Sequence, residues 1–287
     1  MRARDLLTFG QEALKLTGIY EWDYDSQALL EWQCGVTRTD LLLEPERTIS
    51  EEQALAYKAL IERRANHEPL QYIMGECEFM GLPFLVSEDV LIPRQDTEVL
   101  IEWILERERE EQKDSVTLLD VCTGSGCIAI SLDVLWKQYC SSSLQVSALD
   151  VSEKALCIAK KNREKNGAAV HFYHGDMFSQ VTEQYDIVVS NPPYIPTKVV
   201  DELMEEVVGH EPRLALDGME DGLHFYRILA SEGKKHLKEG GRLYLEIGHD
   251  QGMTVPALLK EEGFKGIEVK KDLAGNDRCV VAIFQKS

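Results

Sequence analysis

The four residues Asn191-Pro192-Pro193-Tyr194 have the types and spacing that point most directly to chemistry. They follow the apolar run 185–190, which predicts a buried strand. The side-chain oxygen of Asn191 can accept one hydrogen of a planar NH2 group. The carbonyl of Pro192, whose nitrogen carries no hydrogen, can accept the other. The tetrad therefore suits methyl transfer to an exocyclic or amide nitrogen, and the open question is which nitrogen.

A second candidate segment is the glycine-containing turn Cys122-Thr123-Gly124-Ser125-Gly126, which lies between a predicted strand and a predicted helix. Glycine lets the backbone approach a ligand closely, and the start of a helix offers unpaired N–H groups. The turn matches neither the GxGxxG pattern nor a P-loop. Taken alone, it could equally be a structural turn.

Two further strands end in acidic residues. Asp150 is placed to accept hydrogen bonds from a ribose diol, or else to cap the helix that begins at Ser152. Asp176 could accept from an adenine amino group, and Met177 or Phe178 could cover the ring, although both residue types are common in cores. Because ligands bind at the carboxyl ends of parallel strands, we expect all of these loops to border one crevice.

From residue 116 onward, predicted strands alternate with predicted helices, and these elements must position the residues named above. The pattern predicts strands near 116–121, 144–149, 170–174, 185–190, 242–247, 266–270 and 278–285. It predicts helices near 126–138, 152–166, 221–237 and 250–262. Such alternation predicts an α/β fold with a doubly wound, mainly parallel, seven-stranded sheet. The last connection is too short for a helical crossover, so the last strand should be antiparallel.

The N-terminal part has a different pattern of apolar residues. Residues 1–70 predict a helical domain, and residues 71–95 predict a β-hairpin linker around Gly81. The helical domain either recognises the substrate or simply stabilises the fold. Tyr72-Ile73-Met74 belongs to the first arm of that hairpin. Asp96 or Thr97 would cap the next helix, which opens the catalytic domain at 96–287.

Composition narrows the class of function. The chain has 287 residues, with 31 Lys and Arg against 50 Asp and Glu, a net charge of −19, which disfavours binding to nucleic acid. Its 7 cysteines are odd in number and form no CxxC pair, as expected in a reducing compartment. The histidines form no ligand cluster, so no metal is expected. No secretory or membrane segment is visible, and we expect a cytoplasmic monomer.

Five segments in order, behind the helical N-terminal part, resemble a known family. The sequence is similar to class I S-adenosyl-L-methionine (SAM) methyltransferases. It is most similar to the HemK/PrmC-type family, which methylates the N5 amide nitrogen of a glutamine in peptide chain release factors. The resemblance rests on residues 92–98, 120–126, 190–195, 211–216 and 275–278.

The resemblance implies a Rossmann-like SAM-dependent domain whose protein substrate is a release factor with a Gly-Gly-Gln motif. It implies that residues 122–126 bind the methionine part of SAM, that Asp150 binds its ribose, and that Asn191 serves both cofactor and catalysis. Tyr194 would pack on the plane of the substrate amide, unless it is a plain core aromatic. Met177 stands where the family often has an aromatic residue beside the adenine. Cys122 stands where many members have glycine, so its thiol should point away from the ligand.

Alternatives remain open at this stage. The tetrad also occurs in N6-adenine methyltransferases acting on a flipped base, although the acidic charge and the lack of a basic target-recognition region count against that reading. A glutamine of a ribosomal protein is a second candidate substrate. The acidic segment 201–221 is either a lid or docking rim, or an inert surface. Arg94 either reaches the crevice or forms a surface ion pair.

Overall fold

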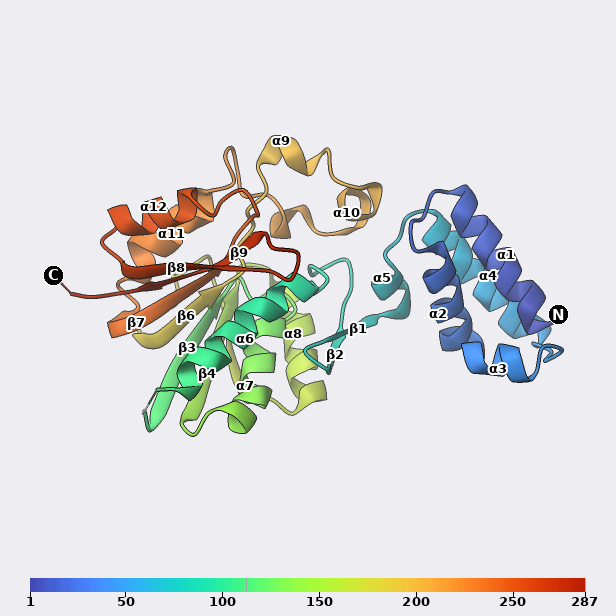
Figure 1. Cartoon of the computed structure of the whole chain (residues 1–287), viewed down its shortest axis with the longest axis horizontal. Helices are drawn as coiled ribbons and strands as arrows, with labels where there is room; N and C mark the ends of the chain where they lie inside the picture. Colours follow the sequence, from blue (N-terminus) through green and yellow to red (C-terminus); the bar gives the residue numbers. More distant parts are fainter. Residues whose placement is uncertain (112, 287) are drawn as a thin grey trace. The chain divides into compact units, whose positions relative to one another are not determined.

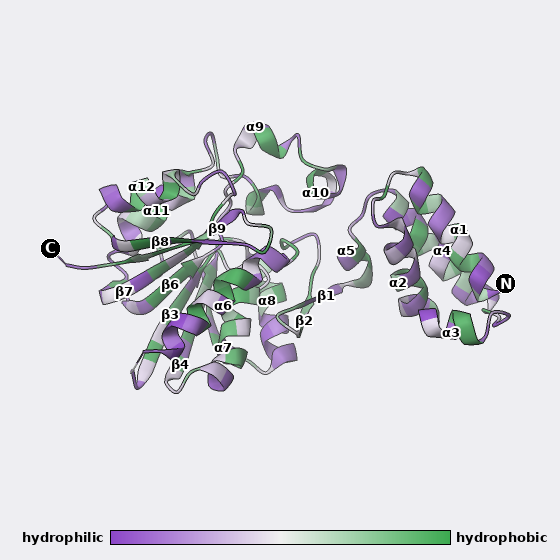
Figure 2. Cartoon of the chain, in the orientation of Figure 1, coloured by the Kyte–Doolittle hydropathy of each residue, from purple (hydrophilic) through white to green (hydrophobic). Residues whose placement is uncertain are grey.

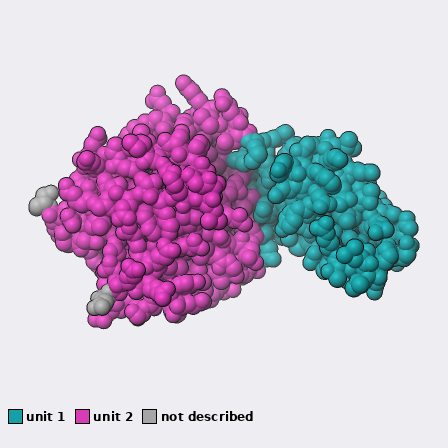
Figure 3. Space-filling model, in the orientation of Figure 1, with its two compact units in different colours: residues 1–76, 204–210 teal, residues 77–203, 211–287 magenta. Residues whose placement is uncertain are grey.

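The computed structural model describes residues 1–111 and 113–286. The chain divides into two compact units (Figure 3). Unit 1 comprises residues 1–76 and 204–210, and unit 2 comprises residues 77–203 and those from 211 onward. The chain therefore leaves unit 2 once, after Leu203, contributes a short segment to unit 1, and returns at Glu211.

Unit 1 is built from amphipathic helices, on which hydrophobic and hydrophilic residues alternate (Figure 2). Its helices are α1 (Ala3–Leu16), α2 (Trp22–Cys34), α3 (Arg38–Leu43), α4 (Glu51–Ala65), α5 (Leu70–Met74) and α10 (Glu205–His210). Their apolar faces form one core that includes Leu6, Leu29 and Ile61, all buried. Ser50 caps α4 by accepting from the Gln53 N–H at 3.1 Å. The helical character predicted for this part of the chain is confirmed.

A buried ion cluster explains why the segment 204–210 belongs to unit 1. Arg64 is 5% exposed, and its Nε donates to Asp25 Oδ2 at 2.7 Å. Its Nη2 donates to Glu206 Oε2 at 2.8 Å. A buried guanidinium needs such partners because an unpaired buried charge is costly. Part of the acidic segment 201–221 is thus used inside unit 1.

The predicted hairpin exists but is shorter than expected. It consists of β1 (Glu76–Phe79) and β2 (Leu82–Leu85), which meet at Gly81 with φ 72°. The assignment of Tyr72-Ile73-Met74 to its first arm is wrong, because these residues lie in α5. Pro69 precedes that helix with φ −55°, and Gly75 ends it in the left-handed conformation with φ 79°.

Unit 2 contains the sheet. Its strands are β3 (Ser115–Val121), β4 (Ser143–Asp150), β5 (Val170–His174), β6 (Tyr185–Ser190), β7 (Leu237–Glu246), β8 (Lys265–Lys271) and β9 (Asp277–Ile283). They lie in the order β5-β4-β3-β6-β7-β9-β8. The pairs from β5 to β7 are parallel, and β9 is antiparallel to both of its neighbours. The predicted fold, with its antiparallel last strand, is confirmed.

Helices cover both faces of the sheet (Figure 1). Successive strand residues point to opposite faces. Leu118 packs with α6 (Gln95–Arg109) and α7 (Cys127–Tyr139), whereas Leu119 packs with α11 (His224–Gly233) and α12 (Thr254–Glu261). Helix α8 (Glu153–Asn166) packs on α7, β4 and β5. Helix α9 (Thr197–Val200) and the 3-10 turn η1 (Arg213–Ala215) lie in the connection that follows β6.

The prediction that Asp96 or Thr97 caps α6 is wrong. The helix begins at Gln95 after Arg94, which makes no side-chain cap. Both polar side chains have tertiary partners instead. Asp96 pairs with Arg278 at 3.1 Å, and the Thr97 hydroxyl donates to Glu246 at 2.6 Å. Long-range contacts have therefore replaced the local one.

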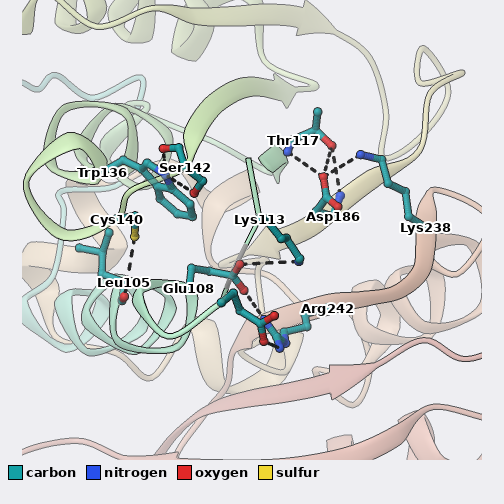
Figure 4. A network of polar contacts seen from close by, with 11 residues as sticks. Leu105, Glu108, Lys113, Thr117, Trp136, Cys140, Ser142, Asp186, Lys238 and Arg242 are labelled. Carbon is teal, nitrogen blue, oxygen red and sulfur yellow. Dashed lines mark hydrogen bonds and ion pairs between the residues drawn. The ribbon is translucent and has the colours of Figure 1, made fainter. Parts of the chain in front are cut away.

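A network of polar side chains joins strands at the end of the sheet opposite the carboxyl ends of the parallel strands (Figure 4). Asp186, near the start of β6, accepts from Thr117 N at 2.9 Å, from Thr117 Oγ1 at 2.8 Å and from Lys238 Nζ at 2.7 Å. Nearby, the buried carboxylate of Glu108 pairs with Arg242. These contacts stabilise the sheet without involving the residues expected at its other end.

We predict that Asp186→Ala destabilises unit 2 without changing its capacity to bind ligands. The change leaves three donors without their acceptor, so the free energy of unfolding should fall by about 2 kcal/mol, the scale of hydrogen bonds to a charged group. Urea denaturation measures the loss. Lys238→Met, which removes only one of the three donors, should cost less. An unchanged unfolding free energy in Asp186→Ala would contradict this role.

Candidate active site

The order of the strands brings two of the predicted segments together. After β3 the chain runs outward through β4 and β5, then returns to β6 on the other side of β3. Val121, the last residue of β3, is the register partner of Ser190, the last residue of β6, and Ser190 Oγ donates to Val121 O at 2.6 Å. The glycine turn and the tetrad therefore leave the sheet side by side, at a topological switch point where open α/β sheets bind ligands.

A cleft opens at this point, with about 990 Å³ of empty space that is partly open to solvent. The lining includes these residues predicted from the sequence: Cys122, Thr123, Gly124, Ser125, Asp150, Asp176, Met177, Asn191 and Pro193. It also includes Arg94, Thr97 and Phe225.

Some predicted residues lie elsewhere. Among the residues that the structure describes, the lining does not include Gly126, Pro192 or Tyr194. Phe178, considered for adenine contact, lies in the core, where its ring stacks on His236 with centroids 4.8 Å apart. Gly126 is the N-cap residue that precedes α7, and a Cβ there would lie 2.9 Å from Ile130 Cδ1. Its lack of a side chain therefore serves helix packing.

The glycine turn is held by the acidic end of β3. The Thr123 hydroxyl donates to Asp120 Oδ2 at 2.6 Å, and Gly124 has φ 56°, a conformation that glycine tolerates. Complete burial raises the pKa of Asp120 to about 7. The turn thus has a defined geometry before any ligand enters.

Cys122 and Met177 form a sulfur-rich wall of the cleft. Both have positive φ, 62° and 46°, and their sulfur atoms lie 3.9 Å apart. Glycine is favoured at such φ values, so a cysteine and a methionine adopt them here at some cost in backbone strain. Burial raises the pKa of the Cys122 thiol above its ordinary value, so the wall is neutral and polarisable. The direction of the thiol relative to a bound ligand stays a prediction.

Asp150 joins two of the loops around the cleft. Its Oδ2 accepts from Gly124 N at 2.8 Å, and its Oδ1 accepts from Ser152 N at 2.9 Å. The cap of α8 is Ser152 itself, whose hydroxyl accepts from Ala155 N at 3.1 Å. Each carboxylate oxygen has a second acceptor position. Asp150 can therefore accept from a diol while it holds the turn in place.

The backbone of the tetrad is held by a hydrogen bond and by a close backbone approach. Gln251 is buried, and its Nε2 donates to Tyr194 O at 3.1 Å and to Gly222 O at 3.2 Å. A Cβ on Gly218 would lie 2.8 Å from Tyr194 Cα. These three supporting residues were missed in the sequence, where the glycines looked like ordinary loop residues.

The side chains of the tetrad also have partners. Asn191 Nδ2 donates to Thr97 Oγ1 at 3.3 Å, and the Tyr194 hydroxyl lies 3.5 Å from Glu246 Oε1. The Tyr194 ring packs against the core of α11 and α12, and burial raises the pKa of its hydroxyl, which keeps it neutral. Thr97 and Glu246 were not among the predicted site residues. Thr97 lies in segment 92–98, which carries part of the family resemblance, but no site role was predicted for it, and Glu246 lies in none of the five segments.

The acidic segment 201–221 is largely paired within the protein. Glu211 is 6% exposed, pairs with Arg94 and accepts from Ile92 N at 3.3 Å. Asp201 pairs with Arg213 at 2.5 Å. Arg94 thus both borders the cleft and forms an ion pair, so the two alternatives considered for it hold together. These contacts join the loop before α6 to the connection after the tetrad.

No group of three or more His, Cys, Asp and Glu within 1–111 and 113–286 is arranged to hold a metal ion. Over the same ranges, no helix combines the length and apolarity needed to cross a membrane.

Models of protein families match both parts of the chain. Residues 5–75 match the PrmC N-terminal domain, and residues 95–219 match the methyltransferase small domain. The first match ends one residue before Glu76, the last residue of the first segment of unit 1, and the second begins at the first residue of α6.

Individual proteins are similar over almost the whole length. A release factor glutamine methyltransferase from Thermodesulfovibrio yellowstonii is 40% identical, covering 94% of this chain and 95% of that protein. One from Clostridium acetobutylicum is 40% identical, covering 99% of both. A crystal structure of a methyltransferase from Pyrococcus furiosus has a TM-score of 0.52 at 18% identity, covering 72% of this chain and 90% of that one, and supports the fold alone.

We predict that Gly218→Ala loosens the tetrad. The added Cβ would lie 2.8 Å from backbone atoms of Tyr194 and Gly222, which cannot move independently. Overpacking of about 1–3 kcal/mol should make amide hydrogen exchange across 191–197 at least about fivefold faster. Ile195, whose N–H bonds to Leu216 O at 3.0 Å, reports the change by mass spectrometry.

Gly209→Ala is the matched control, because a Cβ there meets nothing within 4 Å. It should leave exchange across the tetrad unchanged. Equal exchange in the wild type and Gly218→Ala would show that the close approach does not constrain the loop.

Proposed function

Because the chain belongs to the release factor glutamine methyltransferase family, we propose that it methylates the side-chain amide nitrogen (N5) of the glutamine in the Gly-Gly-Gln motif of class I peptide chain release factors, with SAM as the methyl donor. The observation that carries the proposal is the position of Asn191, which lines the cleft beside the glycine turn at the switch point. A release factor is the proposed partner, and a cytoplasmic monomer is the proposed state.

The cleft has groups suited to each part of SAM. When bound, SAM supplies a methyl group made electrophilic by its sulfonium centre. We propose that the glycine turn and the start of α7 hold the methionine part and that Asp150 accepts from the ribose hydroxyls. Asp176 would accept from the adenine amino group, and Met177 would cover the ring. The fit rests on the second acceptor position at each Asp150 oxygen and on the apolar wall formed by Cys122 and Met177.

The proposed mechanism makes a weak nucleophile reactive by holding it in place. An amide nitrogen is a poor nucleophile because its lone pair is delocalised into the carbonyl. Asn191 Oδ1 and the Pro192 carbonyl would accept both hydrogens of the glutamine NH2 and aim its nitrogen at the methyl group. Both acceptors interact more strongly as positive charge develops on that nitrogen, which stabilises the transition state selectively. The remaining gain comes from proximity and alignment.

The rest of the tetrad would keep this geometry. Pro193 lines the cleft. Tyr194 is not part of the lining: its ring packs against the core and its hydroxyl lies near Glu246, so we propose that the glutamine amide reaches the Tyr194 ring only when the substrate binds. Gln251 donates to the Tyr194 carbonyl, two residues after Pro192, and so restrains the end of the tetrad. The methylated nitrogen would lose one proton to water, which can enter because the cleft is partly open to solvent, and the demethylated cofactor would leave with the S–CH3 bonding electrons on its sulfur.

The substrate is tested by labelling. The protein is incubated with radiolabelled SAM and, separately, a release factor, a ribosomal protein or adenine-containing DNA, and the modified atom is located by mass spectrometry. Label on the glutamine of the Gly-Gly-Gln motif is expected. Label on a ribosomal-protein glutamine or on adenine, with none on the release factor, would overturn the proposed substrate.

We predict that Asn191→Ala lowers turnover by at least about a hundredfold, the scale of losing one preorganised partner of the transition state. Binding of SAM, measured by calorimetry, should survive. Asn66→Ala is the control, because the Asn66 side chain bonds to Glu62 O within unit 1. Near-normal turnover in Asn191→Ala would remove Asn191 from the mechanism.

A further inference from the structure

Three side chains from distant parts of the sequence form a line of hydrogen bonds that ends at Asn191. Asn191 Nδ2 donates to Thr97 Oγ1 at 3.3 Å, and Thr97 Oγ1 donates to Glu246 Oε2 at 2.6 Å. Thr97, on α6, and Glu246, the last residue of β7, are each 2% exposed. Because water has little access to Thr97 and Glu246, it cannot replace a missing hydrogen-bond partner of either side chain. The donor or acceptor role of each group is therefore set by the next group in the line.

The number of hydrogens in this line determines its direction. A threonine hydroxyl has one hydrogen to donate, and an ionised carboxylate can only accept. The Thr97 hydrogen therefore goes to Glu246, and Thr97 can only accept from Asn191. This requires the NH2 end of the Asn191 amide to face Thr97, which leaves Oδ1 directed away from it.

We propose that Thr97 and Glu246 are positioning residues that fix the orientation of the Asn191 amide, so that Oδ1 meets the substrate nitrogen. This inference rests on the proposed function, since a substrate that presents an NH2 group needs an acceptor at that point. With the amide reversed, the N–H groups of Asn191 would face those of the substrate. Oδ1 would then face Thr97 Oγ1, whose hydrogen is donated to Glu246, so neither contact would contain a hydrogen bond. Thr97 and Glu246 act through Asn191 rather than on the substrate.

Protonation of Glu246 would release this constraint. A neutral carboxyl group can donate to Thr97, whose own hydrogen is then available to Asn191 Oδ1, and the amide can reverse. Burial raises the pKa of Glu246 to about 7 in the free protein. The correctly oriented fraction should therefore be lower below that pH, where both orientations are allowed, and should increase as the pH rises through it.

Several groups surround Glu246 and determine when it ionises. Hydrogen bonds from Thr97 and Tyr194 and the charge of Arg278 favour the ionised form, whereas the charge of Asp96 opposes it. The remaining groups are uncharged at neutral pH: on α11, Tyr226, which donates to the backbone carbonyl of Glu246 at 2.8 Å; on β9, Cys279, the register partner; and on α7, Cys127, whose pKa burial raises to about 12. Glu246 is thus the group in this set expected to titrate near neutrality.

The first experiment compares Thr97→Val with Thr97→Ser. Valine keeps the shape and removes the hydroxyl, so kcat should fall by about tenfold, the scale of one hydrogen bond. The KM for release factor and the affinity for SAM should stay within about twofold. Serine restores the hydroxyl and should return kcat to within about threefold of the wild type. Wild-type kcat in Thr97→Val, or an equal loss in both variants, would overturn the proposal.

The second experiment measures kcat against pH. In the wild type kcat should rise through about pH 7. Glu246→Gln cannot ionise, so this rise should be absent at whatever level of activity the variant has. The same rise in Glu246→Gln would exclude Glu246 as its source and overturn the proposal.

A third measurement does not depend on methyl transfer. In the ¹⁵N-labelled protein, the side-chain NH2 signals of Asn191 are identified by their absence in Asn191→Ala. Thr97→Val should shift them and speed their hydrogen exchange by at least about fivefold, since the acceptor for Nδ2 is lost. Unchanged signals, with SAM binding confirming the fold, would overturn the positioning role.

The two proposals can fail separately. A wild-type protein that does not methylate release factor, but whose Asn191 signals respond to Thr97→Val, would contradict the function and support the positioning. A protein that methylates release factor, but whose signals and kcat ignore Thr97→Val, would support the function and contradict the positioning.

Discussion

The site depends on the pairing of β3 with β6. These strands are separated in sequence by β4 and β5, yet their last residues, Val121 and Ser190, are register partners joined by the Ser190 hydroxyl. Parallel strands end at the same edge of a sheet, so this pairing sets the ligand turn beside the tetrad. A slip of one residue would reverse the faces of the strand and break both sets of contacts.

A loop at such an edge is useful only if it is held still. Here the prolines restrict backbone rotation, a closely packed glycine leaves the backbone little space to shift, and polar side chains add hydrogen bonds. The close approach of Gly218 to Tyr194 leaves no room for movement, and Gln251 holds the Tyr194 carbonyl. Thr97 meets the side chain of Asn191 from the other side. Preorganisation of this kind lets hydrogen-bond acceptors stabilise developing charge without first reorienting.

The same site carries an electrostatic cost. Burial raises the pKa values of Asp120 and Glu246 to about 7, so ionising either group in the folded protein is less favourable than in water. Stability from these two groups is therefore fully present below their unfolded pKa values and is lost as the pH rises through about 7. Both carboxylates accept a hydrogen bond from a threonine, and both neighbour segments that form the cleft. Raised carboxyl pKa values of this kind are common where a site must be both polar and enclosed.

The sequence by itself determined the sheet, its antiparallel last strand and the loops that border the cleft, because alternating strands and helices leave few topologies. It also pointed to Asn191, since an asparagine followed by two prolines at a strand end has few structural uses. Tertiary structure alone decided the supporting residues. Thr97 was a predicted helix cap, but its hydroxyl donates to Glu246. Residues 204–210 were predicted to belong to a lid, a docking rim or an inert surface, but Glu206 accepts from the buried Arg64. Local patterns predict local partners, but a buried polar group takes whichever partner the fold brings within reach.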